Sequence, residues 1–177
     1  MLQLCQQKDV GMAGAKLYYP DDTIQHAGVV VGLGGVAAHV LCKLPRDAEG
    51  YMGRLRCVQE ISAVTAACMM VKTSVFKAVG GFDEELKVAF NDIDLCMKVR
   101  KYGVKIVFTP YAELYHYESK SRGMEDTPEK QLRFSREVNC FRRKWERELL
   151  KGDPYYNPNL TLNNTDCSLR KQEKNGD

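Results

Sequence analysis

The chain has 177 residues, of which 44% are hydrophobic and 28% are charged, and its formal net charge is +3. This composition excludes a mainly disordered chain, and the charge is too small to indicate a nucleic-acid-binding protein. No segment approaches the roughly 20 apolar residues that a transmembrane segment needs, and no secretory signal is visible. The length fits one globular domain or a large part of one.

The seven cysteines include no CxxC pair, and several stand inside apolar runs. We interpret them as reduced, mostly buried thiols, which favours a cytoplasmic setting, with membrane association of a complete protein left open. The three histidines, His26, His39 and His116, lack ligand spacing to any cysteine pair, so a zinc site is not expected.

The first third of the chain predicts a hairpin followed by a long loop. Residues 11–19 alternate in polarity and end at a Pro-Asp-Asp turn, and residues 26–31 form a second apolar run. Residues 32–60 are polar and irregular. An irregular stretch of this length in a compact domain is more often a functional loop than a spacer.

The middle of the chain predicts a buried strand and two helices. Residues 64–71 are a continuous apolar run with β-branched ends, typical of a buried strand. A short helix is expected over residues 73–80. The next helix is expected to open at Asn91 or Asp92 and to run to Tyr102.

The last third predicts two short strands, at 104–109 and 112–116, and then a long helix. Thr127 and Pro128 are a strong helix start, with an N-cap residue followed by proline at the first helical position. Residues at spacings of four and three give this helix one apolar stripe: Phe134, Val138, Phe141, Trp145 and Leu149. The polar tail at 163–177 is expected to be disordered.

Two carboxylates, Asp92 and Asp94, stand two residues apart in the first turn of a predicted helix. Side chains at this spacing point in different directions, so one can face a cleft while the other is turned away. A helix N-terminus stabilises the anion, whereas a general base needs a pKa nearer the working pH. Spacing alone favours the alternative, a capped helix with acids that complement the dipole. The DxD pattern opens a helix rather than ending a strand, so we do not assign it as a metal site.

His116 ends a predicted strand and leads into the polar segment at 119–123, which carries hydroxyls, a lysine and an arginine. Such groups suit the oxygens of a diphosphate. On local sequence alone, a packed or surface histidine and a solvated connector remain the alternatives.

The order of four motifs is more informative than any one of them. They are GGFDE at 80–84, FNDIDL at 90–95, the strand at 104–109 with the proline after it, and the histidine and serine at 116 and 119. In this order they resemble the acceptor-side half of family 2 glycosyltransferases of the GT-A fold. The strand at 62–68 and the segment at 153–160 are similar to the same family, so the resemblance covers residues 11 to about 162.

This resemblance implies an α/β fold, an incomplete GT-A-like mixed sheet flanked by helices. It implies transfer of a sugar, with inversion, from a nucleotide diphosphate to an acceptor hydroxyl. Asp92 matches the family's catalytic base, and His116 matches a ligand of the divalent metal, Mn²⁺ or Mg²⁺. The substrate-binding positions that it implies are Asn91, where the family commonly has Glu, Asp94, Thr65, and Ser119 and Arg122 on the loop over the diphosphate.

The nucleotide-binding first half of the family is not recognised in this chain. We therefore expect residues 1–162 to form the C-terminal part of a GT-A domain, which transfers sugar only together with a nucleotide-binding half and need not bind the metal alone. Its partners would be a nucleotide-sugar donor and a glycan acceptor. The alternative is a non-catalytic module that binds glycan or forms a homo-oligomer through an exposed sheet surface. A hydrolase is disfavoured because no serine stands in a GxSxG motif.

Overall fold

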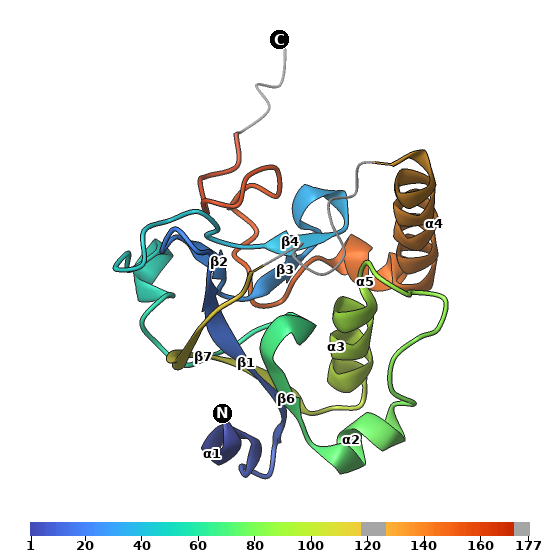
Figure 1. The fold of residues 1–177 in the computed structure, drawn as a ribbon, viewed down its shortest axis with the longest axis horizontal. Helices are drawn as coiled ribbons and strands as arrows, with labels where there is room; N and C mark the ends of the chain where they lie inside the picture. Colours follow the sequence, from blue (N-terminus) through green and yellow to red (C-terminus); the bar gives the residue numbers. More distant parts are fainter. Residues whose placement is uncertain (118–126, 172–177) are drawn as a thin grey trace.

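The computed structural model describes residues 1–117 and 127–171 and shows a mixed sheet flanked by helices (Figure 1), which confirms the predicted α/β class. The strands are β1 (Val10–Tyr18), β2 (Ile24–His26), β3 (Val29–Val31), β4 (Ala37–His39), β5 (Gln59–Glu60), β6 (Met69–Val71) and β7 (Lys105–Tyr115). The helices are α1 (Leu2–Cys5), α2 (Thr73–Ala78), α3 (Asn91–Lys101), α4 (Pro128–Lys144) and α5 (Glu146–Lys151). Short 3₁₀ turns are η1 (Leu33–Gly35), η2 (Tyr51–Gly53) and η3 (Ala66–Cys68).

Strand β1 is the centre of the main sheet, whose order is β2-β1-β7-β5, with β6 also paired to β1. The β1–β7 pair is parallel, while β2 and β6 pair with β1 in the antiparallel sense. All nine residues of β1 are buried, as expected for a strand that has neighbours on both edges and is covered by helices. The hairpin partner of β1 is β2, which shares only His26 with the second strand predicted at 26–31.

Strand β7 is one continuous strand where two strands, at 104–109 and 112–116, were predicted. Its parallel register with β1 jumps from Thr109 opposite Ala15 to Glu113 opposite Lys16. The extra residues on β7 form a bulge that contains Pro110, which has no N–H to give to a ladder. The strand therefore continues after the proline and delivers His116 to the end of β1, where its N–H donates to the carbonyl oxygen of Tyr18 (2.9 Å).

Two other predicted strands are shorter than expected. The run at 26–31 is broken at Gly28, whose φ of 105° lies in the left-handed region, and its second part pairs with β4 inside the stretch expected to be irregular. The run at 64–71 begins with the turn η3, and only β6 is extended. The turn matters for the site, because it holds Thr65 and Ala66 at the edge of the sheet.

A close contact between β1 and Val64 sets the position of this turn. A Cβ on Gly14 would lie 2.3 Å from Cγ1 of Val64, far inside van der Waals contact, and Val64 is fully buried. Glycine is therefore required here so that the segment leading into η3 can lie directly on the strand.

Helix α3 packs on the sheet, where the Cys96 thiol lies 3.5 Å from the sulfur of Met12. Helices α4 and α5 lie outside the sheet (Figure 1). The predicted start of α4 is confirmed, since the Thr127 hydroxyl accepts the N–H of Lys130. The predicted stripe is buried at Phe141 and Trp145, whereas Phe134 is 44% exposed. Within the described part of the chain, no helix has both the length and the apolar character to cross a membrane.

Residues 163–171 differ from the expected disorder of the tail at 163–177. The N–H of Leu41 donates to the carbonyl oxygen of Thr165, and Leu160 and Leu169 form a β-bridge. Cys167 is buried against the core. Polar composition hid this return of the chain because backbone groups make most of its contacts. Residues 172–177 lie outside the described residues.

Candidate functional site

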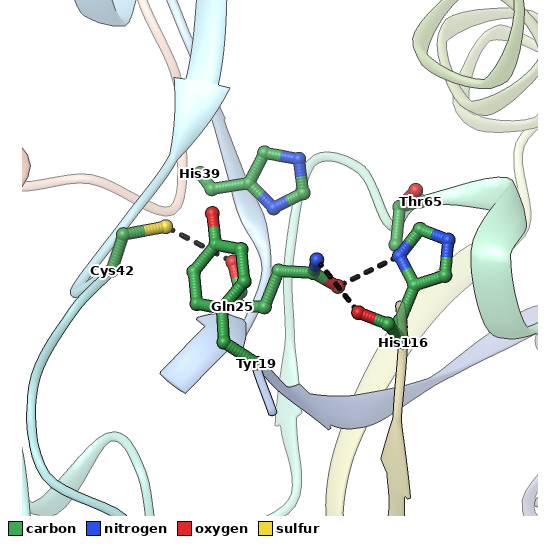
Figure 2. A pocket seen from close by; sticks show the side chains of 6 residues that line it. All are labelled: Tyr19, Gln25, His39, Cys42, Thr65 and His116. Carbon is green, nitrogen blue, oxygen red and sulfur yellow. Dashed lines mark hydrogen bonds between the residues drawn. The ribbon is translucent and has the colours of Figure 1, made fainter. Parts of the chain in front are cut away.

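A small cavity of about 110 Å³ lies where the carboxyl ends of β1 and β7 meet the β2–β4 region (Figure 2). Its lining comes from five separate segments and carries both hydrogen-bond donors and acceptors. The lining residues are Tyr19, Gln25, His39, Cys42, Thr65 and His116. Two of them, Thr65 and His116, are among the residues selected from the sequence.

Gln25 holds His116 through two contacts at once. The Gln25 Oε1 atom is 2.8 Å from Nδ1 of the His116 ring, and Gln25 Nε2 donates to the main-chain oxygen of His116 (3.3 Å). Figure 2 shows the amide on one side of His116, facing both its ring nitrogen and its main-chain oxygen. Gln25 is 4% exposed, so the clamp is sheltered from water.

The other two histidines form a pair behind the cavity. The Nδ1 atoms of His26 and His39 are 2.9 Å apart, and the N–H of Thr65 donates to Nε2 of His26 (3.4 Å). His26 is fully buried, and this burial, together with the neighbouring His39, holds its pKa well below the usual imidazole value. His26 is therefore neutral and links two residues of the cavity wall.

Asp92 lies beside this wall without lining the cavity. Its Oδ2 atom accepts the N–H of Ala66 (3.0 Å), the residue that follows Thr65, and its Oδ1 atom accepts the N–H of Ile93 (2.9 Å). The side chain is half-buried. Consecutive backbone amides of η3 thus bind His26 and Asp92, which fixes the carboxylate next to the histidine cluster.

The residues before Asp92 are held in an unusual conformation. Phe90, the N-cap of α3, has φ 62° and ψ 6°, a left-handed conformation that costs a residue other than glycine roughly 1–3 kcal/mol. Its ring packs against Phe134 and Phe141, with centroids 5.9 and 5.3 Å away. Asn91 is half-buried, and its Oδ1 atom accepts the N–H of Asp92 (2.7 Å). Packing therefore maintains a strained turn directly before the predicted base.

Asp94 points away from the cavity into the protein. It is fully buried, its Oδ1 atom accepts the indole N–H of Trp145 (2.8 Å), and the ammonium groups of Lys144 and Lys98 lie 2.8 and 3.0 Å from its oxygens. These contacts tie α3 to the end of α4. This position differs from the substrate-binding role that the resemblance implied for Asp94, because the ion pairs occupy its carboxylate within the interior.

The described residues hold no group of three or more His, Cys, Asp or Glu side chains that could bind a metal ion. His116 supplies one imidazole near the cavity, which does not make a divalent-metal site by itself. Its role as a metal ligand stays a prediction. Two of the predicted substrate-binding residues, Ser119 and Arg122, lie outside the described residues.

Sequence reasoning missed four residues of the cavity: Tyr19, Gln25, His39 and Cys42. One signal was available for Gln25, a long polar side chain between Ile24 and the small apolar segment after His26. A polar residue inside an apolar strand usually has a specific buried partner. The identity of that partner, 91 positions away, could not be deduced from the pattern.

Comparison with known proteins extends these observations. The chain is 58% identical over 170 residues to the uncharacterized protein y4gI of Sinorhizobium fredii, covering 96% of the chain and 19% of that protein. It is 38% identical over 178 residues to the O-antigen biosynthesis protein RfbC of Myxococcus xanthus, covering 100% of the chain and 14% of that protein. The chain is thus similar to a polysaccharide-biosynthesis protein over its whole length.

A shorter match adds a named transferase. The chain is 36% identical over 62 residues to an N-acetylglucosaminyl-diphospho-decaprenol L-rhamnosyltransferase of Mycobacterium tuberculosis. This match covers 35% of the chain and 20% of that protein. The chain spans less than a fifth of the length of the two relatives that match nearly all of it. No protein-family model and no solved structure matches the chain.

Proposed function

We propose that this chain is the acceptor-side and catalytic-base portion of an inverting glycosyltransferase of family 2, with a GT-A fold. In this proposal a sugar passes from a nucleotide-diphosphate donor to a hydroxyl of a glycan acceptor. The donor-binding part lies outside this chain, which has no transferase activity alone. The observation that carries the proposal is the position of Asp92. Its carboxylate is fixed outside the polar cavity, beside the wall, and His116 is one of the residues that line this cavity.

The geometry suits proton removal from an alcohol. A sugar hydroxyl is a poor nucleophile, and a positioned carboxylate can accept its proton as the new glycosidic bond forms. Among the described residues, Asp92 forms no ion pair with a lysine or arginine, in contrast to Asp94. The hydrogen bond from Ala66 orients one oxygen of Asp92, and such preorganisation is what a general base requires. The names of RfbC and of the rhamnosyltransferase support sugar transfer as the reaction.

The test is Asp92→Asn in a longer protein that joins this chain to a nucleotide-binding part, assayed with UDP-, GDP- and dTDP-linked sugars. Asparagine can keep the hydrogen bond to Ala66 through its Oδ1 atom but cannot take a proton. We expect turnover to fall by about 10²–10⁴-fold, the usual contribution of general-base catalysis, while circular dichroism shows that the protein remains folded. Asp9→Asn, which alters an exposed carboxylate paired with Lys105, is the matched control. A near-normal rate in Asp92→Asn removes Asp92 from the mechanism.

A second candidate is a non-catalytic module that self-associates. Strand β7 pairs with β5 only at Val107 and Phe108, and further along it Tyr111 and Leu114 are 79% and 44% exposed. An incompletely paired strand with exposed apolar side chains can add a strand from another molecule. Light scattering over a range of concentrations tests this candidate, and a monomer throughout the range would count against it.

A further inference from the structure

We infer that Gln25 is a positioning residue that fixes the proton of neutral His116 on Nδ1 and so leaves the lone pair on Nε2. This inference deepens the proposed function, because it assigns a hydrogen-bond polarity to the histidine of the proposed site. It concerns a residue that neither the sequence motifs nor the relatives single out.

The first step is the orientation of the Gln25 amide. The main-chain oxygen of His116 can only accept a hydrogen bond, so the amide group 3.3 Å from it must be the NH₂ of Gln25. The other end of the same amide, 2.8 Å from Nδ1, is then the carbonyl oxygen. The orientation thus follows from the chemistry of the two partners.

The second step is the tautomer of the imidazole. Oε1 can only accept, so a hydrogen bond at 2.8 Å requires a hydrogen on Nδ1. In the neutral ring the other nitrogen, Nε2, then has no hydrogen and acts as an acceptor. Nε2 lies on the side of the ring away from Gln25 (Figure 2).

The third step is the rigidity of the clamp. The main-chain N–H of His116 donates to Tyr18, and its main-chain oxygen accepts from Gln25, so both backbone groups of His116 are fixed. The main-chain oxygen of Gln25 in turn accepts a hydrogen bond from the thiol of Cys42 (3.0 Å), and the strand on which Gln25 stands pairs with β1. Neither partner can rotate without breaking one of these partly buried hydrogen bonds.

The chemical consequence concerns what the Nε2 atom can bind. A lone pair on Nε2 accepts a hydrogen bond from a hydroxyl or binds a cation, and it repels the oxygens of an unprotonated phosphate. An oriented second-shell partner of this kind is how proteins usually set the donor nitrogen of a histidine. Gln25 therefore acts through His116 and needs no contact with substrate.

The test is nitrogen-15 NMR of the imidazole rings, with long-range proton correlation, at a pH well above the usual imidazole pKa of about 6.5. The chain has three histidines, which single substitutions at each can assign. We expect His116 of the unaltered chain to show a protonated Nδ1 and an unprotonated Nε2. In Gln25→Met, which removes the acceptor at similar length, we expect both His116 nitrogens to shift toward the average of the two tautomers.

Two further variants keep the test decisive. Gln59→Met removes a half-buried glutamine that donates to the Arg54 carbonyl and should leave the His116 signals unchanged. Gln25→Glu loses the hydrogen bond to the main-chain oxygen of His116 but retains an acceptor for Nδ1–H, so the hydrogen should stay on Nδ1. A hydrogen on Nε2 of His116 in the unaltered chain, or an unchanged tautomer in Gln25→Met, would overturn the inference. These readouts need no sugar transfer, so a normal rate in Asp92→Asn would overturn the proposed function and leave the role of Gln25 intact.

Discussion

At the scale of single residues, the two carboxylates of one helical turn have opposite surroundings. Asp92 accepts backbone amides beside the cavity, and Asp94 is enclosed with two lysines and the Trp145 indole. Side chains two residues apart in a helix are rotated by about 200° around its axis. They therefore lie on nearly opposite faces, and one faces the core when the other faces outward. Identical chemistry two positions apart therefore serves the interior in one case and the proposed site in the other.

The burial of Asp94 predicts a large loss of stability when its charge is removed. Asp94→Asn keeps an acceptor for Trp145 but breaks the ion pairs with Lys98 and Lys144. The side chains of the two lysines are 19% and 32% exposed, so water compensates part of their charge, and we expect the free energy of unfolding to fall by about 2 kcal/mol. Urea unfolding measures this, and Asp92→Asn, the same change at a half-buried carboxylate two residues away that has no ion pair among the described residues, should cost less. Equal midpoints for the two variants would contradict the structural role of Asp94.

The buried imidazole of His26 predicts a pH dependence of stability. Its pKa is lowered in the folded state by burial and by His39, so the unfolded chain takes up a proton that the folded chain does not. The stabilisation is thus complete above the unfolded pKa of about 6.5 and is lost as the pH falls below it. Between about pH 6.5 and 5 the free energy of unfolding should fall by up to about 1.4 kcal/mol per pH unit from this group.

The matched variant is His26→Gln, which has no group that titrates in this range. Urea unfolding at several pH values should show a flatter dependence in this variant than in the unaltered chain. The range lies above the usual pKa values of carboxylates, so they contribute little to the difference. An unchanged slope would contradict a neutral, buried His26.

At the scale of elements, one side chain of α4 holds the segment that leads into α3. Glu137 is 3% exposed, and its two oxygens accept the N–H groups of Val88 and Ala89 at 3.2 and 2.8 Å. Those residues directly precede the strained Phe90. The apolar stripe thus explains which face of α4 is buried, and Glu137 explains how α4 fixes the turn before Asp92.

Replacing this carboxylate should loosen the turn specifically. Glu137→Gln can keep one acceptor but directs an NH₂ group at the other amide, and hydrogen bonds to charged groups contribute about 1.5–3 kcal/mol. We expect faster hydrogen exchange at the amides of Val88 and Ala89 and a free energy of unfolding lower by about 2 kcal/mol. Glu129→Gln, in the exposed first turn of the same helix, should leave both amides unchanged. Protection that survives Glu137→Gln would show that other contacts hold the segment.

At the scale of the whole molecule, the cavity exists because distant segments converge. Its residues run from Tyr19 to His116 along the chain, and β1 with β7 brings the two ends together. Long parallel pairing places His116 at the end of β1, and the β1–β2 hairpin places Gln25 opposite it. The site is thus a property of the sheet rather than of any one motif.

We expect calorimetry of UDP, GDP and dTDP with Mn²⁺ to show little or no binding to this chain. The reason is that the described residues hold no group of three metal-ligating side chains, and a nucleotide diphosphate is usually bound through its metal. His116→Ala serves as the control, since binding that depends on His116 would be lost in this variant. Micromolar affinity would instead place the donor site within this chain and contradict the proposed division of labour.

Local signals in the sequence were enough to predict several elements. A cap and periodicity located α4, the Asn91–Asp92 signal located the start of α3, alternation located β1, and helical geometry implied that Asp92 and Asp94 diverge. Only the packing of the folded chain shows that Asp92 lies beside the cavity wall while Asp94 is enclosed, that β7 continues past its proline, and that Gln25 meets His116. Local patterns record only the conformational preferences of neighbouring residues, whereas these contacts depend on strand register and packing between segments tens of residues apart.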